Sequence, residues 1–410
     1  MKKYEKIEKL YYKRKNIDEE YKKRIEGYST IVTELELYSE YYKKKVPLFY
    51  NFLPKHFLLQ EKIYKNSKLI ENMFGKIPRL IMLYTINKLL VNEMLYTNEI
   101  EGIFSTKKAI YSVIKSEKND KNIKNEKLIG ITRKYKKILD DKKESVKNIN
   151  DYRKIYDELF EDFLDDNKYK LDGKIFRKET VELKNSMNEV IHRGTSGEEN
   201  IIKELEKLIE FEKNKEIPAL IKSIISHFYL EYIHPFYDGN GRFGRYLLSF
   251  NIAKTVDKYT ALSLSYTIAQ NKMKYYKLFK EIESKYGLGE LTFFVENILE
   301  NIIKGQESIV ELLKETTEKK EKKKKVMNEI KNSKKNLTEK EIEILFIFIQ
   351  DYLFNGFENI TNSELKEILG IKSRITINNY TKEMEKKGFI KEVSKKPLKY
   401  VINDWLAEKF

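Results

Sequence analysis

The segment from His234 to Arg245 brings together side chains that could bind a phosphate group and transfer it. It reads His-Pro-Phe-Tyr-Asp-Gly-Asn-Gly-Arg-Phe-Gly-Arg. Neutral imidazole is well matched to accepting a proton from a hydroxyl near neutral pH, so His234 is the candidate general base. Asp238 stands just ahead of the glycines, where its carboxylate could hold a hard cation such as Mg2+. A base and a cation ligand therefore come from one short segment.

The three residues after Asp238 predict a phosphate-binding loop. Gly239, Asn240 and Gly241 are small or flexible positions whose backbone N–H groups can converge on an anion. The apolar run that follows Arg245 predicts that the loop opens a helix, whose positive end would face the same phosphate. Arg242 and Arg245 are three residues apart, and we expect both on one face of the first turn, where each can bind phosphate bidentately.

This string resembles the signature of the Fic (filamentation induced by cAMP) family, His-x-Phe-x-Asp/Glu-Gly-Asn-Gly-Arg-x-x-Arg, at every specified position. The resemblance implies an all-helical core that moves AMP from ATP to a hydroxyl of a target protein, with Mg2+ as cofactor. It assigns the base to His234 and the Mg2+ site to Asp238. It assigns phosphate binding to the loop glycines with Asn240, and the β- and γ-phosphates of ATP to the two arginines.

A hairpin is predicted shortly before the loop, because two strand-like segments flank the polar stretch Asn-Ser-Met-Asn at 185–188. The resemblance implies that Val190, Ile191 and His192 belong to a flap that pairs with the target chain as an added strand. A purely structural hairpin is the alternative. Tyr275 and Tyr276 look like the tyrosine pair that borders the nucleotide in the family, with simple core packing as the alternative.

A second motif precedes the core. Thr97-Asn-Glu-Ile-Glu101-Gly102 resembles the inhibitory motif of Fic proteins, Ser/Thr-x-x-x-Glu-Gly/Asn, in its N-terminal position. The resemblance implies that a buried Glu101 carboxylate pairs with Arg245 and leaves ATP in an unproductive pose. In some relatives the same glutamate aligns a water that removes AMP, so a hydrolytic second activity is a further expectation.

Two other residues near the loop are expected to be structural. His227 lies seven residues before His234 on an apolar helix face, so the two could form a metal pair. No third ligand is at hand, and we expect a packed, hydrogen-bonded histidine instead. Phe236 is expected to point into the core and anchor the loop.

The elements that must position these residues are mainly helical. The chain has 6 prolines in 410 residues, and apolar residues recur at three- and four-residue spacing, with strands as local exceptions. A lysine- and asparagine-rich stretch at 115–127 predicts an exposed connection. The expected domains are an N-terminal helical region with the inhibitory motif (1–125), a Fic catalytic core (126–305), a lysine-rich linker or solvated helix (306–336) and a winged helix-turn-helix (337–410).

The C-terminal region has the pattern of a winged helix-turn-helix. Thr338 can begin a helix through Phe354, and Thr361 with Glu364 makes a capping box for a second helix, ending at Gly370. A third helix from Ser373 to Gly388 precedes a hairpin. This helix carries residues that could meet phosphates and base edges of DNA: Lys372, Arg374, Asn378, Asn379, Lys382 and Lys386. DNA binding through 372–386 and a protein–protein module that forms a homodimer are both open.

Composition adds few constraints. The net charge is +16, but lysine is abundant throughout, which favours a general compositional bias over a binding patch. The chain has no cysteine, which excludes disulfides, thiolate metal sites and a cysteine nucleophile. No apolar stretch is long enough for a membrane span, and we expect a cytoplasmic protein without membrane contact.

The leading hypothesis is a protein adenylyltransferase that modifies a Ser, Thr or Tyr hydroxyl of a target protein, or of itself, and is held in check by Glu101. The alternative is a DNA-binding transcriptional regulator whose Fic core senses nucleotide, although a pure sensor would not need His234. A third hypothesis keeps the enzyme and changes the donor, since Fic relatives can transfer UMP, phosphate or phosphocholine.

Overall fold

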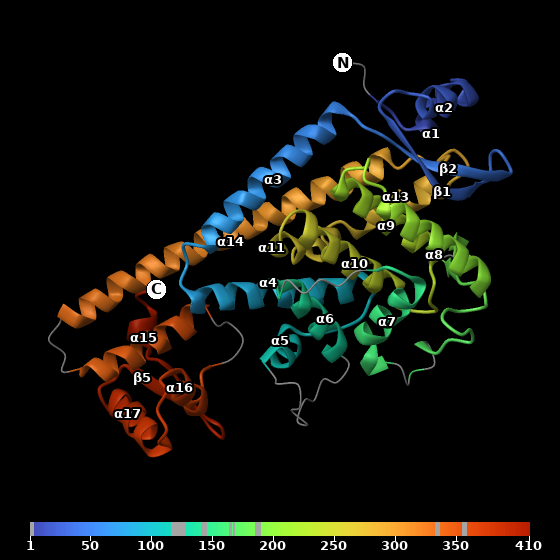
Figure 1. Cartoon of the computed structure of the whole chain (residues 1–410). Helices are drawn as coiled ribbons and strands as arrows, with labels where there is room; N and C mark the ends of the chain where they lie inside the picture. Colours follow the sequence, from blue (N-terminus) through green and yellow to red (C-terminus); the bar gives the residue numbers. More distant parts are fainter. Residues whose placement is uncertain are drawn as a thin grey trace. The chain divides into compact units, whose positions relative to one another are not determined.

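The protein is mainly helical (Figure 1). The computed structural model describes residues 4–115, 128–140, 146–163, 166, 169–184, 190–332, 337–354 and 359–410. The connection expected at 115–127 lies outside these residues except for Lys115, which ends a helix. Within the described part, no helix combines the length and apolar surface that a membrane crossing requires.

The chain forms two compact units, residues 1–70 with 89–309 and residues 71–88 with 310–410. The boundaries of these two units fall inside three long helices. They therefore do not coincide with the boundaries of the four expected ranges. Those helices are α3 (Pro54–Phe74), α4 (Arg79–Ile100) and α14 (Thr292–Asn332).

The larger unit also contains further helices, two of which form a central pair. They are α1 (Ile7–Tyr12), α2 (Ile17–Ile25), α5 (Lys107–Lys115), α6 (Ile129–Leu139), α7 (Ile149–Leu159), the 3-10 helix η2 (Glu161–Phe163), α8 (Glu198–Lys213), α9 (Ala219–Ile233), α10 (Asn240–Thr255), α11 (Lys258–Ala261), α12 (Leu264–Ala269) and α13 (Lys272–Glu283).

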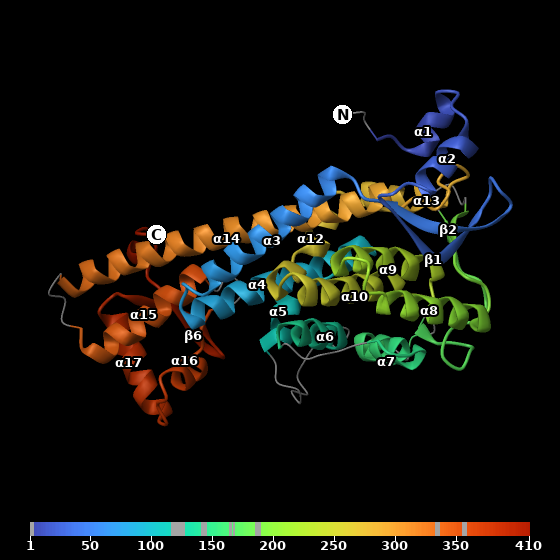
Figure 2. The ribbon, with the colours of Figure 1, turned by 45° about the horizontal axis from the view of Figure 1, so that its top comes forward.

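The central pair is α9 and α10, which lie side by side (Figure 2). Most residues of α9 are buried, including its whole run from Ser223 to Leu230. A helix that is apolar on nearly all sides must be covered on all sides, and here α8 and α10 supply part of that cover. The loop at 234–239 joins the two helices, so two mostly buried helices position it.

The N-terminal region is not wholly helical, which corrects the expectation for 1–125. Strands β1 (Thr30–Ser39) and β2 (Lys44–Asn51) form an antiparallel hairpin. In the sequence, Leu35 and Leu37 alternate with Glu34 and Glu36. In the structure, Thr33, Leu35, Leu37 and Ser39 are buried while the residues between them are partly or fully exposed. This period of two is the pattern of a half-buried strand.

The second hairpin confirms the prediction for the segment before the loop. Strands β3 (Glu182–Lys184) and β4 (Val190–Arg193) are antiparallel, and Leu183 pairs with His192. The polar stretch at 185–188 lies outside the described residues. The backbone of β4 places Val190, Ile191 and His192 in one short strand, and the Val190 side chain is 44% exposed.

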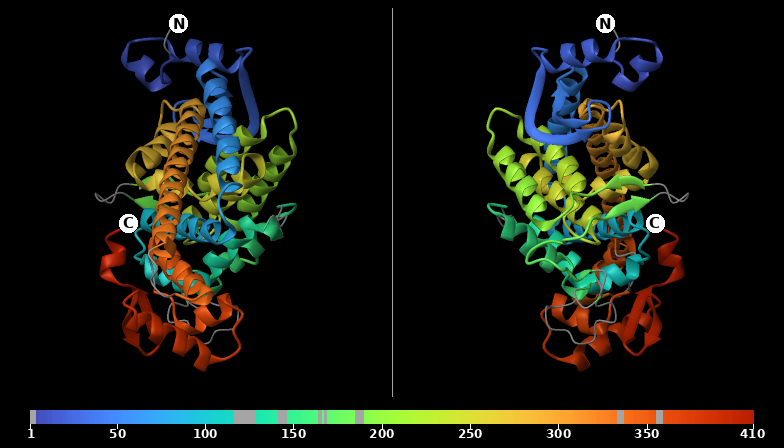
Figure 3. Two further views of the ribbon diagram at one scale, coloured as in Figure 1. Left: turned by 90° about the vertical axis from the view of Figure 1, so that its left-hand side faces the viewer. Right: turned by 90° about the vertical axis from the view of Figure 1, so that its right-hand side faces the viewer.

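The lysine-rich segment at 306–336 is helical as far as Asn332, so it is a helix and not an irregular linker. Figure 3 shows α14 as one continuous helix. It is not fully solvated either, because Val326, Met327 and Ile330 are buried in the core of the smaller unit. These three apolar residues are three and four positions apart, but the abundant lysines around them make this helical spacing hard to recognise in the sequence.

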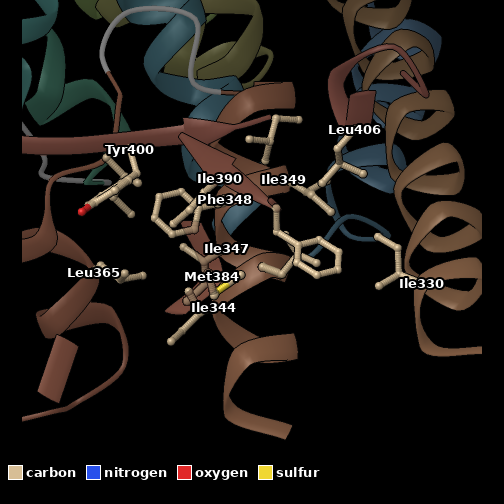
Figure 4. Close-up of a cluster of buried hydrophobic side chains, with 14 of the residues drawn as sticks. Ile330, Ile344, Ile347, Phe348, Ile349, Leu365, Met384, Ile390, Tyr400 and Leu406 are labelled. Atoms are coloured by element: carbon tan, nitrogen blue, oxygen red, sulfur yellow. The ribbon is translucent and has the colours of Figure 1, made fainter. Parts of the chain in front are cut away.

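The smaller unit contains the three helices and the hairpin expected at its C-terminal end. They are α15 (Glu339–Phe354), α16 (Asn362–Ile368), α17 (Arg374–Lys386), β5 (Ile390–Lys395), β6 (Leu398–Ile402) and a short α18 (Asp404–Ala407). Thr361 and Glu364 make the predicted capping box, and Ser373 caps α17. Phe348, Met384, Ile390 and other apolar side chains form one core (Figure 4).

Candidate active site

The candidate base ends a helix in an unusual backbone conformation. His234 follows the last residue of α9 with φ 54° and ψ 61°, in the left-handed region that most residues with a Cβ avoid. The next residue is Pro235, which cannot continue a helix. The chain therefore turns sharply at His234, and this turn directs the following loop back toward the start of α10.

Asn240 holds the loop closed. Its side-chain Oδ1 accepts a hydrogen bond from the backbone N–H of Phe236 at 2.9 Å, and its Nδ2 donates to the carbonyl of Phe236 at 2.8 Å. Phe236 is fully buried and stacks on Tyr156 with ring centroids 3.6 Å apart, as expected for an anchor. Both polar atoms of the Asn240 side chain therefore form hydrogen bonds within the loop. Its backbone N–H is the group that could bind an anion.

Arg177 is an important residue that the sequence did not single out. It is fully buried, its Nε donates to the carbonyl of His234 at 2.8 Å, and its NH2 donates to the carbonyl of Ile233 at 3.3 Å. These carbonyls belong to the end of α9, where no intrahelical donor is available. Arg177 therefore stabilises the turn that presents His234. Nothing in the spacing of the sequence connects it with a loop 57 positions later.

The surroundings of His234 favour its neutral form. Its Nδ1 lies 3.3 Å from the carbonyl oxygen of Glu231, which a proton on Nδ1 would satisfy, leaving the Nε2 lone pair for a substrate. Burial, with smaller contributions from the nearby His192 and Arg177, lowers the pKa of His234 to about 3. The imidazole is therefore unprotonated at neutral pH, as a general base must be.

The first turn of α10 has the backbone geometry that an anion site requires. Gly239 precedes it with φ 79°, and the N–H groups at the start of a helix have no intrahelical acceptors. Gly241 leaves no room for a side chain, since an added Cβ would overlap Oε1 of Glu101. The Glu101 carboxylate therefore already lies against this helix N-terminus, where negative charge is favoured.

Arg245 is held by the segment that carries the motif at 97–102. Its NH1 lies 2.8 Å from Oε1 of Glu101, its Nε donates to Oγ1 of Thr97 at 3.0 Å, and its NH2 donates to the carbonyl of Thr97 at 2.9 Å. The Arg245 side chain is 1% exposed and that of Glu101 28%, so the carboxylate is only partly buried, contrary to the expectation of a buried group. Thr97, the first residue of the motif, accepts two hydrogen bonds from Arg245 and therefore helps to fix the guanidinium, as Glu101 does.

Comparison with known proteins now identifies the region. Residues 147–251 match the model of the Fic/DOC family. The chain contains a Fic domain. A crystal structure of a Fic family protein from Desulfovibrio desulfuricans has a similar fold, with a TM-score of 0.52 and 19% identity over 87% of this chain and 98% of that one.

Two other solved structures are more distant. A Fic domain containing signalling protein from Bacteroides thetaiotaomicron has a TM-score of 0.45 and 14% identity, over 61% of this chain and 97% of that one. Fic-1 from C. elegans has a TM-score of 0.42 and 13% identity, over 64% of this chain and 74% of that one.

The matched Fic domain contains α7 to α9 and most of α10, so it includes the loop, Arg177 and both loop arginines. Arg242 points into different surroundings from Arg245. Its guanidinium lies over the ring of Phe160, 4.7 Å from the centroid, and its NH2 donates to the hydroxyl of Tyr169. Its buried Nε has no partner among the described residues. The two guanidinium groups therefore have different partners, and they do not converge on one position in this structure.

Asp238 in the Fic domain fits the requirements of Mg2+. Its Oδ1 accepts the backbone N–H of Gly239 at 2.5 Å, which orients the carboxylate beside the anion site. Magnesium is commonly held by one or two carboxylates together with substrate phosphates. Among the described residues there is no cluster of three or more metal-ligating side chains, so the phosphates would have to supply the remaining ligands.

The tyrosine pair lies outside the matched Fic domain range and divides into two roles. The hydroxyl of Tyr275 lies 2.7 Å from Nε2 of His227, and both residues are buried. Burial lowers the pKa of His227 to about 3, so this histidine is a neutral, packed residue, as expected. Tyr276 is 40% exposed and donates to the carbonyl of Ile100 at 3.0 Å, which ties it to the end of α4 just before Glu101.

Proposed function

We propose that the chain is a protein adenylyltransferase that moves AMP from ATP to a hydroxyl of a target protein or of itself. Support comes from a neutral His234 beside an anion-binding helix N-terminus within a Fic domain. The single observation that carries the proposal is the occupied arginine: Glu101 holds Arg245 at 2.8 Å, as a carboxylate standing where a phosphate would bind.

In the proposed reaction, the hydroxyl oxygen of the target forms a bond to the α-phosphorus of ATP. The bond between that phosphorus and the pyrophosphate oxygen breaks in line, and the hydroxyl proton passes to Nε2 of His234. The N–H groups at the start of α10 and the guanidinium of Arg245 bind the charged oxygens. Mg2+ held by Asp238 supplies further neutralisation of phosphate charge when it is bound.

Inhibition follows from competition for Arg245. The γ-phosphate and the Glu101 carboxylate both need the same guanidinium, and both carry negative charge that favours the N-terminus of α10. While Glu101 is in place, the triphosphate lacks one of its anchors and its α-phosphorus is not positioned for attack. Removal of Glu101 should therefore activate the enzyme without any change in His234.

The proposal is tested by incubating wild-type, Glu101→Gly and Glu101→Gly/His234→Ala proteins with ATP and Mg2+ and measuring their intact masses. We expect an increase corresponding to one or more AMP groups in Glu101→Gly alone. A mass increase of UMP or phosphate, seen with the matching donor, would mean that the donor is not ATP as an AMP source. The chain would still be a transferase that modifies hydroxyl groups. No increase with any donor, or with a cell extract as the source of targets, would contradict the proposal.

A second function is supported by α17. Lys372, Arg374, Asn379, Lys382 and Lys386 are exposed, as phosphate- or base-contacting residues must be. Asn378 is less available, because its Oδ1 accepts from Nδ2 of Asn362 at 2.8 Å. We propose that this face binds DNA, which would add sequence-specific localisation to the transferase. A protein–protein role that forms a homodimer is the competing use of the same unit.

A further inference from the structure

The larger unit contains a cavity of about 120 Å3 among α7, α8, α9 and α10. This is several times the volume that one water molecule needs, roughly 10 to 15 Å3. Its apolar wall consists of the buried side chains of Ile155, Leu208, Leu230 and Leu248. None of the described residues that line it has been assigned to proton transfer, phosphate or metal. The cavity is therefore a separate feature from the candidate active site.

Glu212 brings a carboxylate to this cavity without a cation in contact with it. Burial raises the pKa of Glu212, and the positive charges of Lys222 and Lys254 offset that rise only in part. The ammonium of Lys222 donates to the carbonyl of Asn214. The ammonium of Lys254 lies over the ring of Phe250, 4.1 Å from its centroid. A carboxylate in such surroundings is stabilised by a cation that reaches it from the cavity.

Two hydroxyls lie close to the same carboxylate. Oγ of Ser226 is buried and has no hydrogen-bond partner among the described residues, although it is near enough to Glu212 to favour the charged form. Burial raises the pKa of Tyr152, and the charge of Glu212 raises it further, so this hydroxyl is also nearby. Both residues line the cavity, as does His227, whose buried Nδ1 likewise lacks a partner in the described part of the chain.

These groups share one chemical property, because a carboxylate, a hydroxyl oxygen and an unprotonated imidazole nitrogen all accept hydrogen bonds. Buried polar atoms without partners cost free energy. A ligand that lowers this cost must supply several donors at one point, and a positive charge beside Glu212. A primary ammonium group meets both requirements, since it carries three N–H donors and one charge.

We propose that this cavity binds a small primary amine, with the ammonium group at Glu212 and a short alkyl chain along the apolar wall. The carboxylate, Oγ of Ser226 and the hydroxyl of Tyr152 each accept one N–H of the ligand. Burial of the alkyl chain adds the hydrophobic contribution. Gly244 also lines the cavity, so the ligand contacts the helix that carries Arg245 in its first turns.

The test measures binding of n-butylamine to the full chain at neutral pH by titration calorimetry and saturation-transfer NMR. Small ligands gain only limited affinity, so the titration extends to on the order of 50 mM. We expect one saturable site. n-Butanol has the same chain without the charge and should bind at least about tenfold more weakly, because hydrogen bonds between charged groups are stronger. Potassium ion has the charge without the chain and should compete weakly.

Three variants locate the ligand in this cavity. Glu212→Gln removes the charge at similar size and should weaken n-butylamine binding at least about tenfold. Ser226→Ala removes one acceptor and should weaken it about threefold to tenfold. Glu206→Gln changes an exposed glutamate on the same helix, α8, and is the matched control with unchanged affinity. Circular dichroism verifies that each variant is folded, and Ser226→Ala serves alone if Glu212→Gln is not.

The inference would be overturned by any of three results. These are no saturable binding of n-butylamine, equal binding of n-butanol or potassium ion, and wild-type affinity in both cavity variants. AMP transfer plays no part in these measurements. Failure of the amine site therefore leaves the proposed transferase untouched, and an inactive transferase leaves the amine site untouched.

Discussion

Oε1 of Glu101 lies 2.8 Å from NH1 of Arg245, beside the first turn of the helix that follows the loop. This ion pair joins a residue at the end of α4 to a residue 144 positions later, and Thr97 supports it with two hydrogen bonds from the arginine. The proposed anion site therefore has one of its arginines, Arg245, already paired with a carboxylate.

Removal of the Glu101 charge should be sufficient for activation. Glu101→Gln keeps the size of the side chain and removes the charge that competes with phosphate, so we expect transfer to rise about 10- to 100-fold, the range of a typical coupling between sites. Initial rates with labelled ATP would measure the change. Glu99→Gln, an exposed glutamate on the same helix, is the control and should leave the rate unaltered.

The base should work over a wide pH range. Because the pKa of His234 is lowered to about 3, its imidazole is neutral from about pH 8 to about pH 5, and kcat/KM of the activated enzyme should not fall over that range through His234. His234→Ala should lower transfer about 10²- to 10⁴-fold while ATP binding is retained. A rate that falls in proportion to protonation of an ordinary histidine, near pH 6.5, would contradict this assignment.

Acid should destabilise the fold through His227. Its pKa is about 3 in the folded protein and 6.5 in the unfolded chain, so the unfolded chain binds a proton first as pH falls. The stabilisation is fully present above about pH 6.5 and is lost as pH falls toward about 3. Urea unfolding across this range should show a shallower pH dependence in His227→Gln than in wild type. Equal slopes would show that His227 is not buried in its neutral form.

Loss of Arg177 should loosen the turn at His234. Arg177→Gln removes the donor to the carbonyl of His234, while the carbonyl of Ile233 keeps the backbone N–H of Thr195, and we expect the free energy of unfolding to fall by about 2 kcal/mol. Transfer by the activated enzyme should fall as well, because His234 is no longer fixed. Arg193→Gln removes an exposed arginine from the flap and serves as the control. Unchanged stability and rate in Arg177→Gln would refute the role given to it.

DNA binding by the smaller unit should depend on the exposed face of α17. The Arg374→Ala/Lys382→Ala double variant should weaken binding of duplex DNA, and each phosphate contact removed should reduce the slope of log K against log salt by about 0.9. Fluorescence anisotropy over a salt series measures both quantities. Lys409→Ala, outside α17, is the control. If the wild-type chain does not bind duplex DNA even at low salt, the DNA-binding proposal is wrong and the protein–protein role is the remaining candidate.

Much of this site could be predicted because its parts are close in sequence. The base, the Asp238 carboxylate, the glycines and the arginines occupy twelve positions, so helix and loop geometry alone bring them together. The pair of Glu101 and Arg245 is long-range, and a resemblance to known sequences was needed to expect it. Its partial exposure could not be read from the motif, since exposure depends on everything packed around the end of α4.

The residues that were missed are those whose function is set by the fold. Arg177 has no distinctive spacing to His234, and only the tertiary structure brings it to that residue. The first hairpin, in contrast, has a readable signal in the sequence, because Glu34 and Glu36 alternate with Leu35 and Leu37. The strong helical periodicity elsewhere obscured it. The separation of Arg242 from Arg245 likewise depends on aromatic neighbours from distant segments.

The left-handed backbone conformation of His234 determines which substitution can inactivate the protein without straining the turn. Alanine would remove the imidazole and also strain the turn, whereas asparagine tolerates this conformation and lacks a base near neutral pH. A Glu101→Gly/His234→Asn protein should keep the loop open to ATP and the turn at residue 234 unstrained, yet never complete a turnover. Such a protein is suited to trapping a physiological target in complex with the nucleotide.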